Sequence, residues 1–465
     1  MSGPALRNDP TPATEVTLPI ARVLQVVHEY EQADRLQEAE EWLRPVLLAA
    51  PNSAEALNLM GLLACRQDRL AEAAGFMERA IAQSPSETLY FRNISSVYER
   101  LGRYDESLAA GRRAIELDPY DANSYHNLSV THYRLLQLEE CIAAARRGIA
   151  LDPTLPSPHF ALAEALLLRG DLQAGWEEYE WRYRIPTAGQ LMPPTDRPQW
   201  DGAPMADRVL LLIADQGFGD IIQFARFIPW AVQRCPDVVL FCPGEIRRLL
   251  RHNFPGLRLV DRWEACPDFA AFCPLSGLPR LSGTRIDNIP ATPYIRAEPG
   301  RAAAWRQRIA RLLPSGYRRI AVVWSGRPLP ANRSIGLPTL APIAALDRIG
   351  LFSLQMGAAQ NEVDSYYGRA PLISLGHEIS DFMDSAAILE SMDLVVTIDT
   401  ALGHLAGAMG RPVSILLPYA PDWRWLLDRD DTPWYPTAQL FRQPGPGQWA
   451  PAISRLAAKL AAPAV

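Results

Sequence analysis

A short loop with two glycines and an aspartate has the composition of an acid–base site. Residues 216–220 read QGFGD and follow an apolar run, 209–214, that predicts a buried strand, and a helical stretch comes next. Gly217 and Gly219 permit a tight turn and the close approach of a substrate, which places Asp220 at the mouth of a cleft. Because a helix N-terminus favours an ionised carboxylate, Asp220 is a candidate general base for an attacking hydroxyl. An N-cap role for this carboxylate is equally compatible with the spacing.

A second loop suits an anion such as phosphate. The strand predicted at 394–398 leads into Asp399 and Thr400 at a helix start, where free N–H groups and the helix dipole attract negative charge. His404 lies one turn further along and could donate to the same phosphate. The alternative is a threonine cap followed by a histidine that packs against the sheet.

A third loop follows the strand predicted at 320–324 and adds positive charge. It contains Ser325, Arg327, Asn332 and Arg333. The forked donors of two arginines can neutralise a diphosphate. Because all three loops leave the carboxyl ends of strands and all three suit anions, each supports the interpretation of the others.

An aromatic segment lies near the C-terminus. Residues 421–435 read PDWRWLLDRDDTPWY and include Trp423. Such a segment can stack on a nucleotide base or a sugar, or it can cover the sheet, and the residues favour neither reading.

Short apolar runs that alternate with helical stretches surround these loops and predict α/β layers. A first half covers about 205–283, and the proline-bearing stretch 284–299 joins it to a second half. A cleft between two such halves is a common place for a small-molecule site. The expected strands are 209–214, 238–242, 258–260, 320–324, 351–354, 394–398 and 413–417.

The first third of the chain is periodic. Prolines recur every 34 residues, at Pro51, Pro85, Pro119 and Pro153. This period is typical of tetratricopeptide repeats, here over about 20–187 with a degenerate first repeat at 20–51. We expect a curved solenoid whose groove binds a protein partner, the alternative being a platform that only supports the rest of the chain. The candidate groove residues are Tyr90, Asn93, Tyr125 and Asn127.

Composition narrows the classes of function. The chain has 465 residues, 48% hydrophobic and 21% charged, enough to bury cores in about two or three domains. A net charge of -6 gives no support to a nucleic-acid partner, and the single lysine, Lys459, nearly excludes chemistry by a buried amine. The N-terminal residues lack a signal-peptide pattern and no apolar run of about 18 residues occurs, so we expect a soluble, cytoplasmic protein without a transmembrane segment.

Six cysteines form neither a C-x-x-C pair nor a dense disulfide framework. Four of them make two seven-residue spacings, at Cys235, Cys242, Cys266 and Cys273. They are either metal ligands that the fold brings together or isolated buried thiols. We favour buried thiols, because structural zinc sites usually have closer ligand spacing.

Four segments in combination resemble bacterial tetratricopeptide-repeat glycosyltransferases whose catalytic part is similar to the ADP-heptose heptosyltransferases. They are QGFGDIIQF at 216–224, NRSIGL at 332–337, DTALGHLAGAMGRPV at 399–413 and PDWRWLLDRDDTPWYP at 421–436. The resemblance implies that Asp220 is the base on the acceptor hydroxyl, that Thr400 and His404 hold the donor phosphates, and that Asp399 orders their loop. The donor-binding residues expected in total are Gly217, Gly219, Ser325, Arg327, Asn332, Arg333, Asp399, Thr400, Gly403, His404 and Trp423.

The expected fold is an N-terminal tetratricopeptide-repeat α-solenoid followed by a GT-B pair of Rossmann-like α/β domains. The expected boundaries are 1–19 for an extended or disordered N-terminus, 20–187 for the repeats, 188–299 for the acceptor-side half with its linker, and 300–465 for the donor-side half. The expected activity is that of an inverting, metal-independent glycosyltransferase that needs no cofactor besides its nucleotide-sugar donor. The acceptor is a hydroxyl, expected on Ser or Thr of a protein recruited by the repeats, and family resemblance suggests flagellin or another surface protein. The alternatives are a non-catalytic scaffold with a vestigial sugar-nucleotide domain and a transferase that acts on a glycan or lipid-linked glycan.

Overall fold

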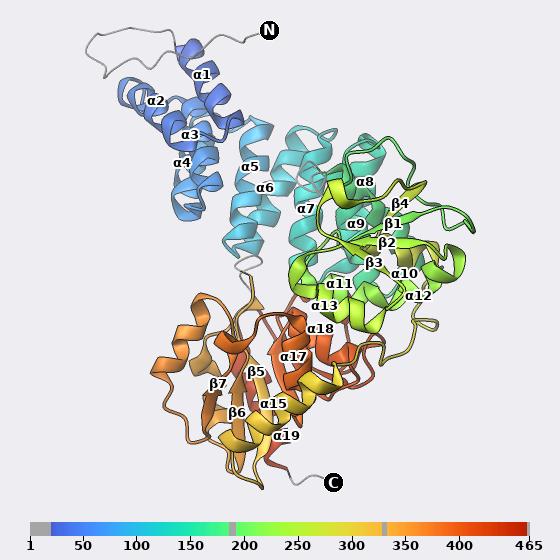
Figure 1. Ribbon diagram of the computed structural model, residues 1–465. Coiled ribbons are helices and arrows are strands. Elements are labelled where there is room, and N and C mark those ends of the chain that lie inside the picture. Colours follow the sequence, from blue (N-terminus) through green and yellow to red (C-terminus); the bar gives the residue numbers. More distant parts are fainter. Residues whose placement is uncertain (1–19, 186–191, 328–332, 463–465) are drawn as a thin grey trace, which may run out of the picture. The chain divides into compact units, whose positions relative to one another are not determined.

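The computed structural model of the protein describes residues 20–185, 192–327 and 333–462 (Figure 1). It divides into two compact units, residues 1–153 and 154–465. The extended or disordered stretch expected at 1–19 lies outside the described residues, as does the candidate site residue Asn332.

The first unit consists of helix pairs. Its helices are α1 (Ile20–Gln32), α2 (Leu36–Ala49), α3 (Ala54–Arg66), α4 (Leu70–Gln83), α5 (Thr88–Arg100), α6 (Tyr104–Leu117), α7 (Ala122–Arg134) and α8 (Leu138–Leu151). The second helix of every pair ends two residues before one of the periodic prolines, which lack the N–H that a continuing helix needs. The solenoid predicted from the 34-residue period is thus confirmed.

Small residues let the paired helices approach closely. A Cβ atom on Gly61 of α3 would lie 2.7 Å from Met77 Cγ of α4, so only glycine fits at this crossing. Hydroxyl groups satisfy one another where α5, α6 and α7 meet, because Ser107 Oγ donates to the carbonyl of Ser95 at 2.7 Å and lies 2.8 Å from Thr131 Oγ1.

The second unit begins with helices and continues with two parallel sheets. Its first elements are α9 (Pro156–Arg169), α10 (Leu172–Tyr179) and the short 3-10 helix η1 (Glu180–Arg184). The first half has the sheet order β3-β2-β1-β4 and the second the order β10-β9-β8-β5-β6-β7, with every strand pair parallel. The predicted α/β layers are confirmed.

The elements of the first half are β1 (Leu210–Ile213), α11 (Phe218–Phe224), η3 (Ala225–Phe227), α12 (Ile228–Arg234), β2 (Val238–Phe241), α13 (Gly244–Asn253), β3 (Arg258–Val260), η4 (Trp263–Ala265), β4 (Ala271–Pro274), η5 (Leu275–Gly277) and α14 (Leu278–Leu281). Those of the second half are α15 (Pro299–Leu312), β5 (Arg318–Val323), η7 (Leu337–Leu340), α16 (Ala341–Ala344), β6 (Ile349–Ser353), η8 (Ala358–Ser365), β7 (Leu372–Ser374), η9 (Gly376–Glu378), α17 (Phe382–Leu389), β8 (Leu394–Ile398), α18 (Ala401–Ala408), β9 (Val413–Leu417), η10 (Trp423–Trp425), β10 (Ala438–Arg442) and α19 (Trp449–Ala461). Sequence analysis missed β4, β7 and β10, each of which lies at a sheet edge and has a shorter or less apolar sequence than the central strands.

The division between the units differs from the repeat boundary expected at 187. Helices α9 and α10 have the repeat pattern, yet they belong to the same compact unit as the α/β halves. The reason lies in their side chains, since Trp176 of α10 packs edge-on against Trp423 with 5.1 Å between ring centroids. The last helix pair therefore has its own contacts with the α/β part.

Candidate functional site

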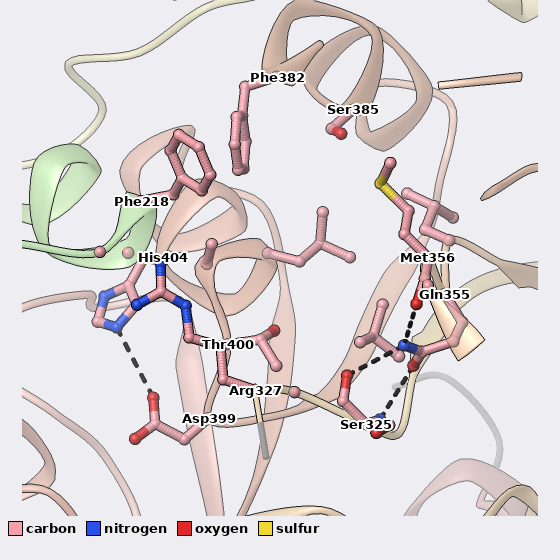
Figure 2. Close-up of a pocket in the computed structure, with 18 of the residues that line it drawn as sticks. Phe218, Ser325, Arg327, Gln355, Met356, Phe382, Ser385, Asp399, Thr400 and His404 are labelled. Atoms are coloured by element: carbon pink, nitrogen blue, oxygen red, sulfur yellow. Dashed lines mark hydrogen bonds and ion pairs between the residues drawn. The ribbon is translucent and has the colours of Figure 1, made fainter. Parts of the chain in front are cut away.

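One cavity of about 650 Å³ lies where the strand-end loops of the two α/β halves meet. Its walls include the loop after β1 with the start of α11, the loops after β5 and β6, and the loops around α17 and α18 (Figure 2). The predicted site residues that line it are Gly217, Gly219, Asp220, Ser325, Arg327, Arg333, Asp399, Thr400 and His404. Three separate loops predicted from sequence thus border a single space.

Asp220 lies in the first turn of α11 and does not cap that helix. The N-cap residue is Gly217, whose position a larger side chain would crowd, because a Cβ there would lie 3.3 Å from Asp220 Oδ2. The carboxylate is partly open, with 24% of its side chain exposed. This placement removes the N-cap alternative and leaves the carboxylate on the cavity wall.

Arg424 is an ion-pair partner of Asp220 that sequence analysis did not single out. The residue is 5% exposed, and its guanidinium forms an ion pair with Asp220 Oδ1 and donates to Asp422 Oδ1 and Oδ2 at 2.8 and 2.9 Å. It also donates to Gln223 and lies 4.2 Å from the Trp423 ring centroid. Burial acts to lower the pKa of Arg424, but Asp220 and Asp422 outweigh it and hold that pKa well above its usual value.

Burial raises the pKa of Asp422, and the positive charge of Arg424 offsets this rise only in part. Both Arg424 and Asp422 line the cavity. Both residues lie within the motif at 421–436, one of the segments on which the family resemblance rests. That resemblance was the only feature of the sequence that pointed to a role for them at the site.

His404 is held from both sides of its ring. Nδ1 lies 2.9 Å from Tyr435 Oη, and Nε2 lies 3.7 Å from Asp399 Oδ1 (Figure 2). Burial acts to raise the pKa of Asp399, but the hydrogen bond and the charge of His404 outweigh it, so that pKa is lowered. Because a Cβ on Gly219 would lie 2.7 Å from His404 Cδ2, glycine is required where the first half touches this histidine.

The start of α18 provides the features that a phosphate needs. Thr400 is the N-cap residue, but its hydroxyl lies 2.9 Å from Thr397 Oγ1 and makes no side-chain cap, so it does not occupy the first free N–H groups of the helix. Arg333 borders the same space, and its buried Nε has no hydrogen-bond partner among the described residues. A Cβ on Gly326 would lie 3.3 Å from this Nε, so the glycine lets the arginine cross the loop.

Gln355, at the end of β6, is a cavity residue that sequence analysis missed. Its Oε1 accepts from the backbone N–H groups of Trp324 and Ser325 at 3.1 and 2.9 Å, and its Nε2 donates to the carbonyls of Ser325 and Met356 at 3.1 and 3.0 Å (Figure 2). The amide therefore fixes the loop that carries Arg327. No motif of charged or catalytic residue types marks a buried glutamine of this kind.

Two expected donor residues do not line the cavity. Trp423 is 2% exposed and packs edge-on against Trp176 and Trp434, which leaves no ring face open for a base or a sugar. Gly403 lies under the start of α18, where a Cβ would be 3.2 Å from Thr397 Cγ2, so it serves the packing of helix on sheet. The structure thus gives both residues a packing position in place of the expected donor contact.

The candidate groove residues of the first unit lie in different environments. Asn93 and Asn127 line a smaller cavity of about 320 Å³. Asn93 Nδ2 donates to Asn58 Oδ1 at 3.1 Å. Tyr90 is 8% exposed and packs in an apolar cluster, and burial raises its pKa. Tyr90 thus has a packing position and does not line this cavity, and Tyr125 is half-buried and does not line it either.

Of the four cysteines with seven-residue spacing, Cys235, Cys242 and Cys273 are buried and Cys266 is partly buried, and none of the four forms a disulfide. Across the described ranges, no group of three or more His, Cys, Asp or Glu side chains could hold a metal ion. Over the same residues, we find no helix with the length and apolar character needed to cross a membrane.

Comparisons with known proteins agree with the two parts of the chain. Residues 380–421, which include the loop into α18, match the profile of glycosyltransferase family 9 (heptosyltransferase), and residues 93–121 match a tetratricopeptide repeat profile. Protein FlbA of Caulobacter vibrioides is 26% identical over 336 residues, which are 65% of this chain and 54% of FlbA. The chain therefore spans about half the length of this curated relative.

Some solved structures are similar to part of this chain. MamA 41-end from Desulfovibrio magneticus RS-1 is 18% identical with a TM-score of 0.32, and the match covers 36% of this chain and 96% of MamA. The pilF protein of Pseudomonas aeruginosa is 17% identical with a TM-score of 0.33, and the match covers 35% of this chain and 75% of that protein. According to the family profiles, the chain combines a tetratricopeptide repeat with a region similar to glycosyltransferase family 9.

Proposed function

We propose that this protein is an inverting glycosyltransferase with a GT-B arrangement, which moves a sugar from a nucleotide donor to a hydroxyl group of a protein. One observation carries the proposal: a carboxylate from the first half and anion-suited groups from the second half line the same cavity. The family 9 match over 380–421 supports a donor site in the second half.

In the proposed reaction, Asp220 takes the proton of the acceptor hydroxyl as its oxygen attacks the anomeric carbon of the sugar. The bond from that carbon to the phosphate oxygen breaks on the opposite face, which inverts the configuration. The N–H groups at the start of α18, together with Arg327 and Arg333, take up the negative charge on the departing nucleotide. These groups supply the charge that a metal ion supplies in other transferases, so the proposal includes neither a metal nor a cofactor.

A nucleotide screen on the full chain tests the donor site. UDP, GDP, ADP, dTDP and CMP are added separately, and the melting temperature is recorded. A ligand at about 100 times its Kd stabilises a protein by roughly 2.7 kcal/mol, so one of these nucleotides should raise the melting temperature measurably. Arg333→Ala should reduce the rise by about half or more, whereas Arg369→Ala, which removes an exposed arginine paired with Asp347, should leave it unchanged.

The outcomes of this screen separate the alternatives. If none of the nucleotides stabilises the wild-type chain, the donor site is wrong. If one nucleotide stabilises the chain but its sugar conjugates are never hydrolysed or transferred, the chain is a binding scaffold rather than an enzyme.

We also propose that the repeats recruit the protein acceptor, with flagellin or another surface protein as the first acceptor to test. Three asparagines that line the smaller cavity, Asn93, Asn123 and Asn127, support this role, because side-chain amides can hold the backbone of an extended segment. The triple variant Asn93→Ala, Asn123→Ala, Asn127→Ala should lose acceptor modification while keeping hydrolysis of the donor. Arg113→Ala, on the exposed side of α6, is the matched control. Full modification by the triple variant would contradict recruitment through this cavity.

A further inference from the structure

The helix segment that precedes the α/β halves contacts the loop that carries Asp220. Helix α10 ends at Tyr179, and η1 follows directly. Trp176 Nε1 of α10 donates to the carbonyl of Thr284 at 3.3 Å, which anchors this segment on the α/β part. Because both elements belong to the second unit, their contacts with the loop lie within one compact body.

A buried polar cluster joins this segment to the residue at which the loop begins. Tyr183 Oη donates to Asp215 Oδ2 at 3.0 Å, and the backbone N–H of Ser276 donates to Asp215 Oδ1 at 3.2 Å. The Arg182 guanidinium lies between two rings, 4.1 Å from the centroid of Tyr179 and 3.9 Å from that of Tyr183. Burial raises the pKa of both tyrosines, so their hydroxyls stay protonated. The base of the loop is therefore fixed by charge and hydrogen bonds.

Gln216 connects this cluster to Asp220. One terminal atom of its amide has three donors around it, with Tyr179 Oη at 3.1 Å and both Arg182 Nε and Ser276 Oγ at 3.3 Å. The other terminal atom lies 3.1 Å from Asp220 Oδ1. Only one orientation satisfies both ends: the oxygen faces the donors and the nitrogen donates to Asp220.

The two oxygens of Asp220 are therefore not equivalent. Oδ1 accepts from Gln216 and forms the ion pair with Arg424, whereas Oδ2 has no hydrogen bond from any described residue. Oδ2 is the oxygen that a side chain at Gly217 would crowd. The free oxygen is thus the one available to a ligand in the cavity.

We infer that Tyr179 and Gln216 are positioning residues that hold Asp220 Oδ1 so that Oδ2 is presented to the acceptor hydroxyl. This inference rests on the proposed function, and it gives α10 and η1 a part in the catalytic centre that recruitment of an acceptor does not require. A carboxylate that must take a proton during attack loses rate when it rotates away, even if the donor still binds.

The test measures nucleotide release by full-length variants from UDP-, GDP-, ADP-, dTDP- and CMP-sugars. Gln216→Met keeps the length of the side chain and removes its hydrogen bonds. We expect kcat to fall about 10- to 100-fold, the scale for one hydrogen bond to a charged group, with donor Kd within about twofold of wild type. Tyr179→Phe removes one oxygen and should lower kcat about 3- to 10-fold, since it acts through Gln216.

Two controls separate positioning from general stability. In the Asp220→Asn background, Gln216→Met should cause no further loss, because a residue that acts only through the base has nothing left to position. Tyr183→Phe removes a hydroxyl of the same cluster that does not reach Gln216, so it should lower the melting temperature and leave kcat within about threefold.

The outcomes are distinct. Additive loss in the double variant, or wild-type kcat in both Gln216→Met and Tyr179→Phe, overturns the inference and leaves the proposed function in place. If Gln216→Met does not fold, Tyr179→Phe decides alone. If the wild-type chain releases nucleotide from none of these donors, the proposed function fails and the positioning role fails with it.

Discussion

Removing the Arg424 guanidinium is the sharpest test of whether its ion pairs with Asp220 and Asp422 hold the two sides of the cavity together. Arg424→Met keeps much of the aliphatic stem, but it removes the guanidinium that lies over the Trp423 ring and leaves the carboxylates of Asp220 and Asp422 without their cation. Breaking a buried ion pair by removing one partner costs roughly 3–5 kcal/mol. The two carboxylates are 24% and 34% exposed, so water compensates in part and we expect the lower end, about 3 kcal/mol. In a unit of about 300 residues, this lowers the melting temperature by about 5 °C.

The loss should also depend on pH in a definite direction. The pKa of Asp422 is already raised by burial in the folded protein, and without Arg424 it rises further. A carboxyl with a raised folded-state pKa binds more protons folded than unfolded, so stability falls as pH rises through and above the ordinary carboxyl range. The deficit of Arg424→Met relative to wild type should therefore be smaller at pH 5 than at pH 8.

Differential scanning fluorimetry of the full chain at both pH values measures this deficit. Arg429→Met is the matched control, because Arg429 lies on the same loop and pairs with the exposed Asp431, where an ion pair contributes at most about 1 kcal/mol. Adding Asp422→Asn to Arg424→Met should recover part of the loss, since one uncompensated charge is gone. A deficit under about 1 °C, or one that is the same at pH 5 and pH 8, would refute the reasoning.

Three further predictions concern the cavity. Asp220→Asn should keep nucleotide affinity and lower turnover at least about a hundredfold, and wild-type turnover in a folded variant would contradict its role as base. Thr400→Ala, His404→Ala and Arg333→Ala should each weaken nucleotide binding in calorimetry about tenfold or more, the scale of a charge-assisted contact, and unchanged affinity in all three would move the donor site elsewhere. Gly219→Ala should place a methyl group 2.7 Å from His404 Cδ2 and lower the melting temperature by about 2–5 °C, whereas an unchanged melting temperature would show that the side chain of His404 can move to admit the methyl group.

The elements that position the cavity were largely predictable, because each has a local cause. Recurrent prolines end the second helix of each repeat, and the fully apolar runs at β1, β8 and β9 form the central strands of parallel sheets. The glycines and the aspartate at 216–220 follow directly from the end of β1, so the strand itself brings them to the cleft. Local periodicity and strand-end rules are enough for this part of the site.

The partners of the predicted residues were not predictable, since they depend on contacts between distant segments. Arg424 lies about two hundred positions from Asp220, and nothing in either local sequence states that the two will meet. Trp423 shows the converse error, because aromatic composition alone does not distinguish a ring that stacks on a ligand from one that packs under α10.

The same limit explains why the last helix pair was assigned to the repeats. Helices α9 and α10 keep the repeat periodicity, which reflects only how a helix packs against its neighbours in the chain. Their contacts with the rest of the second unit include Trp176 and Tyr179 of α10, and Arg182 of the adjoining η1 extends them; the partners are the aromatic segment and the loop that leads to Asp220. A residue that fits the repeat pattern can therefore also hold the residues that line the cavity. Only its neighbours in three dimensions show which of these two roles it has. For this reason a shortened chain meant to isolate the α/β part should begin at residue 154, because a start near 186 would remove the residues that fix the base of the loop.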